Sequence, residues 1–78
     1  MQPIERQFGE VVRRRREKLG LSQEEFADRA GIHRTYVSSI ELGKVGISIG
    51  IAHKLAATLG LRLSKLFQDV EKTAGKEG

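Results

Sequence analysis

The stretch GIHRTYVSSIELGK, residues 31–44, gathers side chains that form directional hydrogen bonds into one short helical segment. It places His33 and Arg34 side by side, follows them with hydroxyl groups, and ends in a lysine. Val37 and Ile40 recur at helical spacing, so the segment has an apolar face for a core and a polar face opposite. The donors and acceptors of the polar face are suited to recognising a polar partner.

These side chains do not form a catalytic or metal-binding constellation. The Ser and His residues have no triad-like arrangement, the sequence has no glycine-rich phosphate loop, and no pair of acids falls in a predicted pocket. His33 and His53 lie on different predicted helices and the chain has no Cys, so we expect no metal site. We therefore predict a binding protein that is not an enzyme, with no cofactor and no small-molecule ligand.

The composition is that of a small basic protein. The 78 residues contain 14 Lys and Arg against 10 Asp and Glu, a net charge of +4. That balance suggests an anionic partner, although many basic domains have none. The absence of Cys, of a signal-peptide pattern and of a membrane-length apolar run predicts a soluble cytoplasmic protein. We expect one domain over residues 1–78, with its core at about 5–70 and a frayed polar tail at 73–78.

Glycines and helical periodicity divide the chain into five short helices, predicted at about 5–19, 23–30, 34–42, 49–59 and 64–70. Gly20, Gly31, Gly43 and Gly60 each follow an apolar periodic stretch, where a left-handed C-terminal cap belongs. The apolar stripes of the helices are expected to comprise Phe8, Val11, Val12, Leu19, Phe26, Ala27, Ala30, Val37, Ile40, Ile49, Ala52, Leu55, Ala56, Leu59, Leu66 and Phe67.

Local signals support the helix boundaries. Ser22 and Glu25 form the capping-box pattern SQEE, and Ser48 is placed to cap the fourth helix. Arg15 falls inside the apolar stripe of the first helix, so we expect its stem to pack while its guanidinium reaches water. The basic run at 13–18 could bind phosphates, but a solvated helix face is the commoner role and the one we favour.

The segment from 22 to 41 has the pattern of a helix-turn-helix. Ala27 lets the second helix approach closely, Gly31 permits a sharp turn, and Ile32 with Ile40 sets the crossing angle. The third helix would then present its other face outward, in the position that enters a major groove.

The strings GLSQEEFADRAGI, RTYVSSIELGK and ISIGIAHKLAATLGLRLSKLF resemble the Cro/repressor-type (XRE-like) transcriptional regulators over about residues 8–67. The string RTYVSSIE is similar to the controller proteins of restriction–modification systems. The resemblance implies an all-α, compact five-helix Cro/repressor-like domain that binds double-stranded DNA. The chain departs from the family pattern at Arg15, Leu19, Ile47, Gly50 and Arg62, none of them on the recognition face.

The resemblance also assigns roles to individual positions. Base edges would be met by His33, Arg34, Thr35, Ser38 and Ser39, and DNA phosphates by Ser22, Gln23, Tyr36 and Lys44. The guanidinium of Arg34 matches the O6 and N7 acceptors of guanine, so we expect it to read most of the sequence. Tyr36 could belong to the core instead. Arg16 and Glu41 match a pair that forms an internal salt bridge in this family.

We expect a homodimer on a pseudo-palindromic operator, since one recognition helix reads only a few base pairs. Apolar residues beyond the helix-turn-helix could form the dimer interface: Ile47, Ile51, Leu63, Phe67 and Val70. Two alternatives remain open, an antitoxin-like autorepressor and a protein-interaction adaptor on the same scaffold. An adaptor would expose apolar anchors on the third helix, where this sequence has short polar side chains.

Overall fold

The computed structural model describes the backbone of residues 3–77 and the side chains of residues 3–73, and contains no β-strand within that range. Its five helices are α1 (Ile4–Lys18), α2 (Gln23–Ala30), α3 (Arg34–Glu41), α4 (Ile49–Thr58) and α5 (Leu63–Glu77). The predicted all-α class is confirmed, and the boundaries of the first four helices agree with prediction to within about a residue. No helix in this range is long and apolar enough to cross a membrane.

Side-chain caps and glycines set the ends of the helices. The Ser22 hydroxyl accepts a hydrogen bond from the Glu25 amide at 3.0 Å, and the Glu25 carboxylate accepts one from the Ser22 amide at 2.9 Å. The amide of Ser22, together with its hydroxyl, lowers the pKa of Glu25. Ser48 caps α4 by accepting from the Ile51 amide at 3.1 Å. The capping box and the glycine stops are confirmed, because all four predicted glycines have positive φ.

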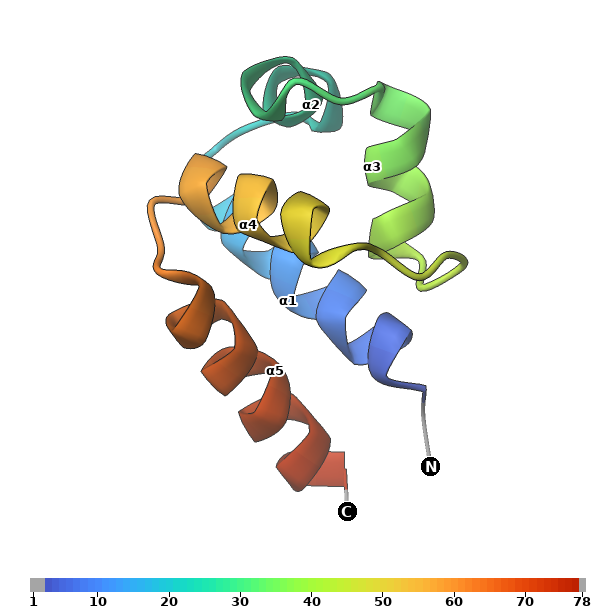
Figure 1. The fold of residues 1–78 in the computed structure, drawn as a ribbon, viewed down its shortest axis with the longest axis vertical. Helices are drawn as coiled ribbons and strands as arrows, with labels where there is room; N and C mark the ends of the chain where they lie inside the picture. Colours follow the sequence, from blue (N-terminus) through green and yellow to red (C-terminus); the bar gives the residue numbers. More distant parts are fainter. Residues whose placement is uncertain (1–2, 78) are drawn as a thin grey trace.

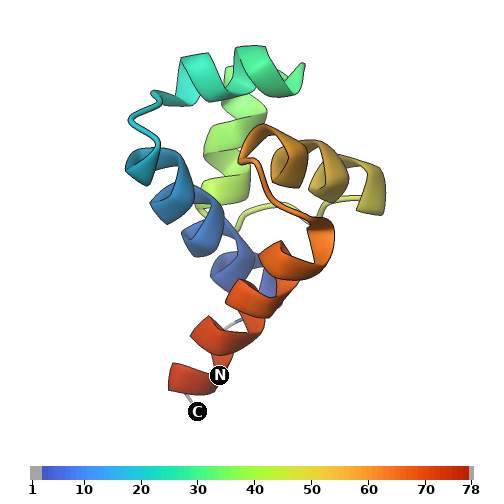
Figure 2. The ribbon, with the colours of Figure 1, turned by 90° about the vertical axis from the view of Figure 1, so that its left-hand side faces the viewer.

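Helix α1 makes its main contacts with two other helices. It packs against α3 and α5, while α2 packs on α3 and α4, and α4 packs on α5 (Figures 1 and 2). In both views α2 lies at one end of the molecule, and the start of α1 and the end of α5 lie at the other. The largest side chains of the shared core, all almost fully buried, are Val11, Val12, Phe26, Val37, Ile40, Leu55, Leu66 and Val70.

Helices α1 and α3 lie in close contact at Gly9. A Cβ atom at this position would lie 2.2 Å from the carbonyl oxygen of Ile40 and 2.7 Å from that of Glu41. Both neighbours are backbone atoms, so a larger residue would force the two helices apart. Gly9 was not among the predicted core or turn positions. The available signal was a glycine within a helical pattern and away from its ends, which usually has a packing reason.

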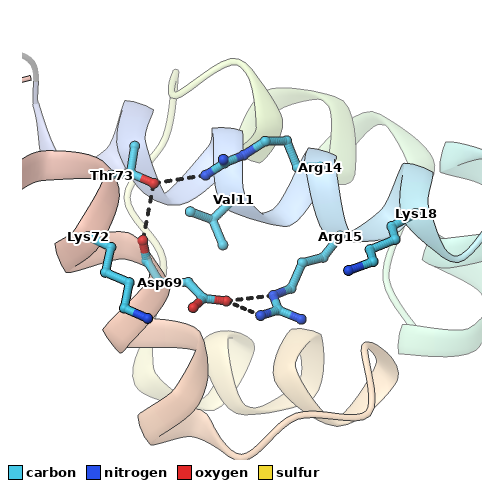
Figure 3. Close-up of a pocket in the computed structure, with 7 residues that line it drawn as sticks. All are labelled: Val11, Arg14, Arg15, Lys18, Asp69, Lys72 and Thr73. Carbon is cyan, nitrogen blue, oxygen red and sulfur yellow. Dashed lines mark hydrogen bonds and ion pairs between the residues drawn. The ribbon is translucent and has the colours of Figure 1, made fainter. Parts of the chain in front are cut away.

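Helix α5 is longer than predicted. It was expected to end near residue 70 and to fray from 73, but it continues to Glu77; residue 78 lies outside the described range. Helix α1 contacts the start of this extension, since Arg14 Nη2 donates to Thr73 Oγ1 at 2.8 Å (Figure 3). The pairing partners are 59 residues apart in the sequence, so no local pattern could reveal them.

Three side chains are placed differently from the prediction. Arg15 does not reach freely into water: its guanidinium bonds to the Asp69 carboxylate of α5, with Nε 2.6 Å from Oδ2 (Figure 3). Leu19 is 52% exposed, because it is the C-terminal cap and lies beyond the packed face of α1. Ile49 is 78% exposed, because the first turn of α4 lies at the rim of an open apolar groove.

Candidate nucleic-acid interface

A buried network at Glu41, the last residue of α3, fixes this helix against α1 and α2. Arg16 Nε lies 2.7 Å from Glu41 Oε2, and Arg16 Nη2 lies 3.1 Å from Oε1. Arg16 Nη1 donates to the Leu21 carbonyl oxygen at 2.7 Å. Gln23 Nε2, from the start of α2, donates to Glu41 Oε1 at 3.0 Å. One carboxylate therefore ties together three helices.

The predicted pair of Arg16 and Glu41 is present, and it is shielded from water. The side chains are 11% and 3% exposed. Hydrogen bonding to Glu41 raises the pKa of Arg16 above its ordinary value, against the opposing effect of burial. Every buried side-chain nitrogen and oxygen in the described part of the chain has a hydrogen-bond partner. The network is therefore fully satisfied, which is the condition under which buried charges specify a geometry.

The turn between α2 and α3 follows from small residues and local hydrogen bonds. Gly31 adopts φ +72°, the left-handed conformation that glycine enters without strain. The Ile32 amide donates to the Ala27 carbonyl oxygen at 3.0 Å, which closes the end of α2. Ala27 is buried, and Ile32 packs against the core. The helix-turn-helix geometry is as predicted.

His33 is the N-terminal cap of α3, a role that the sequence analysis missed. Its Nδ1 accepts a hydrogen bond from the Thr35 amide at 3.1 Å. Because Nδ1 accepts, the ring proton of the neutral side chain is assigned to Nε2, which has no hydrogen-bond partner in the described part of the chain. The signal in the sequence was position: His33 immediately precedes the first helical residue, where a side-chain acceptor belongs.

The polar face of α3 is exposed at its start and partly covered further along. Arg34 and Thr35 are exposed, whereas Ser38 and Ser39 are half-buried. Arg34 forms no ion pair with any side chain in the described part of the chain. With His33 it borders an open groove whose α2 side carries Glu24, Glu25 and Asp28. The guanidinium of Arg34 is therefore available to an external acceptor.

The expected phosphate contacts fall into different environments. Ser22 and Lys44 are exposed, but the Ser22 hydroxyl already serves the capping box. Gln23 is half-buried and uses one N–H on Glu41, so it braces α2 against α3. Tyr36 is half-buried and packs against the core. Of the two roles considered for Tyr36, its packing agrees with the core position.

The residues expected at a dimer interface also lie in different environments. Ile47 and Phe67 line the open apolar groove between α1, α4 and α5, whereas Ile51 and Leu63 are half-buried against the core. Val70 is only 1% exposed. It faces inward because α5 packs along α1, so the prediction that Val70 is available to a partner is wrong. Ile4 and Ile49, which were not predicted, line the groove instead.

Known proteins with similar sequences and structures share this helix-turn-helix architecture. The helix-turn-helix model HTH_3 matches residues 12–66. Control protein C.MunI of Mycoplasma sp is 47% identical over 73 residues, which cover 92% of this chain and 99% of the relative. The crystal structure of the restriction–modification controller protein C.AhdI from Aeromonas hydrophila superposes with a TM-score of 0.78 at 36% identity, covering 81% of this chain and 96% of that chain.

A further solved structure supports the fold alone, because its sequence identity is 22%. It is the controller protein C.Esp1396I, a tetramer in complex with its natural 35 base-pair operator. The TM-score is 0.84, over 94% of this chain and 96% of that chain.

The segment matched by the family model begins within α1 and ends within α5, so it contains the whole helix-turn-helix and the Arg16–Glu41 pair. It spans well over half of the chain. The chain therefore belongs to the helix-turn-helix (HTH_3, XRE-type) family of DNA-binding transcription regulators.

Proposed function

We propose that this protein acts as a controller-type regulator, a homodimer that inserts α3 into the major groove at each half of a pseudo-palindromic operator. The observation that carries the proposal is the contrast along α3. Its C-terminal end is locked by the Glu41 network, while Arg34 and Thr35 at its start are exposed. A rigid helix with a free polar end is what base-edge recognition needs.

Within this proposal the base contacts come from α3. The guanidinium of Arg34, which has no ion-pair partner among the described residues, donates its fork to guanine, a contact worth about 1–3 kcal/mol of discrimination. His33 offers its Nε2 proton to an acceptor, since Nδ1 is used by the cap. Thr35, Ser38 and Ser39 supply hydroxyl groups along the same helix.

Phosphate contacts are assigned to the edges of the helix-turn-helix. Lys44 is exposed directly after α3, and Ser22 and Gln23 lie at the start of α2. Such contacts position the protein without reading sequence. Tyr36 is half-buried, so only the exposed part of its side chain is proposed to contact a phosphate.

We propose that the apolar groove at the start of α1 forms the two-fold interface. The groove holds a cavity of about 170 Å³, and its rim exposes Ile4 (55%), Ile49 (78%) and Phe67 (40%). Large apolar side chains clustered in this way favour association. A dimer would set the two recognition helices about 34 Å apart, one turn of DNA.

The controller role rests on the 47% identity to C.MunI, which extends over nearly the whole of both chains. We propose that this protein acts in the cytoplasm, binds operator DNA of its own system, and has no catalytic role. The adaptor and antitoxin-like alternatives are not favoured by any residue described above.

The decisive experiment compares two variants on DNA selected from a random pool. Arg34→Ala should lose discrimination between selected and scrambled sites, because it removes a base reader. Lys44→Ala should weaken both DNAs equally and lower the slope of log K against log salt by about one. Equal affinity of Arg34→Ala and the parent protein for the selected site would refute the assignment of Arg34.

Two further outcomes test the rest of the proposal. If no sequence is enriched and binding to DNA is absent at low salt, the chain serves as an interaction module instead. Sedimentation tests the dimer separately: Ile49→Glu or Phe67→Glu should yield monomers that keep their helical content. A monomeric parent protein at micromolar concentration, both free and on DNA, would contradict the dimer.

A further inference from the structure

A second charged surface lies between α1 and α5, where the helices border a groove of about 310 Å³ (Figure 3). Val11 forms part of its wall, and basic side chains of both helices line it. Arg14 and Lys18 come from α1 and Lys72 comes from α5. The function proposed above uses none of these cations.

Two of the guanidinium groups that line the groove are held in place. Arg14 donates to Thr73 Oγ1 at 2.8 Å, and the Thr73 hydroxyl donates to the Asp69 carbonyl oxygen at 3.1 Å. Arg15 is bonded to the carboxylate of Asp69 (Figure 3). A cation fixed by protein contacts loses less side-chain entropy when a ligand binds.

Among the described residues, the charge in the groove is not balanced. Asp69 is the one acid of this part of the chain that lines it, and its carboxylate is already paired with Arg15 and, at 3.5 Å, with Lys65. Arg14, Lys18 and Lys72 form no ion pair with any side chain of the described residues. These three positive charges border one cavity, so a compact anion would relieve their mutual repulsion.

The groove lies on the opposite side of α1 from the DNA-reading helix. Gly9 and Arg16 face α3, whereas Arg14, Arg15 and Lys18 face α5. Because α1 separates the two surfaces, a ligand in the groove would not compete with DNA at α3.

We propose that the α1–α5 groove is a binding site for a compact oligophosphate anion, a ligand with two or more phosphate groups. Arginine and lysine are the usual phosphate-binding side chains, and a ligand with several phosphates can meet three cations spread along one groove. The proposal does not depend on DNA binding and extends beyond it.

The test is calorimetric titration of the full chain with inorganic triphosphate at constant ionic strength. The double variant Lys18→Gln/Lys72→Gln should bind at least about tenfold more weakly, a change of about 1.4 kcal/mol. The matched control Arg29→Gln/Lys54→Gln removes the same charge from exposed positions on α2 and α4 and should bind as the parent does. Triphosphate should also raise the unfolding temperature of the parent and of the control, by linkage.

The DNA surface needs its own control, because it also attracts anions. Lys44→Ala should keep the parent's affinity for triphosphate while losing affinity for DNA. If Lys44→Ala loses triphosphate and Lys18→Gln/Lys72→Gln does not, the anion occupies the DNA surface and the proposal is wrong. Equal losses in the groove variant and the Arg29→Gln/Lys54→Gln control would show nonspecific attraction, and equally tight citrate binding would contradict the assignment to phosphate.

Discussion

Glu41 lies on α3, the helix proposed to read DNA, yet it acts inside the protein. Its carboxylate accepts two hydrogen bonds from Arg16 and one from Gln23, and its side chain is 3% exposed. A buried carboxylate without its cation would keep the cost of desolvation and lose the attraction that offsets it. The pair therefore fixes the position of α3 against α1 more than it adds to the net free energy of folding.

Removing one member of the pair should destabilise the protein more than replacing both. Arg16→Met leaves the Glu41 carboxylate uncompensated and should cost about 3–5 kcal/mol of unfolding free energy. Arg16→Met combined with Glu41→Leu should recover a large part of that loss. Urea denaturation followed by circular dichroism measures both, and a double variant no more stable than Arg16→Met would contradict this account.

Loss of the N-terminal cap at His33 should reduce stability by less than loss of the ion pair. His33→Ala removes the acceptor of the Thr35 amide and should cost about 1 kcal/mol, whereas His33→Asn supplies a better capping side chain and should restore it. Both variants lose the imidazole Nε2 donor. If the histidine also contacts DNA, His33→Asn should fold as stably as the parent but bind the operator more weakly in a gel shift.

At the scale of elements, much of the architecture was readable from local signals. The capping box at Ser22 and the glycines with positive φ act within a few residues, so the sequence pattern locates them. The end of α5 was not readable. Its last turns contain few apolar residues, and a contact made there, from Arg14 to Thr73, comes from the first helix.

On the proposed recognition surface, too, some features follow from local sequence and others from contacts between helices. The exposure of Arg34 and Thr35 follows from the periodicity that buries Val37 and Ile40, so the sequence could predict it. The bond from Gln23 to Glu41 depends on the crossing of two helices, which no local pattern specifies. For that reason Gln23 was predicted to contact a phosphate and to be able to brace the first recognition residue, and its bond to Glu41 emerged only from the three-dimensional arrangement.

Two glycines inside helices should respond to alanine in opposite ways. At Gly9 a methyl group would meet backbone oxygens at 2.2 and 2.7 Å, so Gly9→Ala should destabilise the protein by at least about 2 kcal/mol. At Gly50 the nearest atom is 3.7 Å away, so Gly50→Ala should gain about 0.5–1 kcal/mol from helix propensity. Thermal unfolding compares the two. Equal shifts in melting temperature would mean that Gly9 does not control the approach of α1 to α3.

At the scale of the whole molecule, the chain is closed by contacts between its first and last helices. Arg15 of α1 and Asp69 of α5 form a partly buried pair, with side chains 29% and 15% exposed. Partial burial opposes ionisation of Asp69, but the hydrogen bond and charge of Arg15, with Lys65 nearby, hold its pKa below the ordinary value. Ionised Asp69 therefore stabilises the folded chain.

This pair predicts how stability depends on pH. A carboxyl whose pKa is lower when folded contributes its full stabilisation above its unfolded pKa, about 3.9, and loses it as the pH falls through the folded pKa. Asp69→Asn should therefore be less stable than the parent by about 1–2 kcal/mol at pH 7 and pH 5. Below about pH 4 the difference should shrink, because the parent's Asp69 becomes neutral as well. Urea denaturation at pH 7, 5 and 3 measures the difference, with Asp28→Asn as the control for an exposed carboxylate on α2. A difference that stayed constant down to pH 3 would show that the charge of Asp69 does not hold α5 against α1.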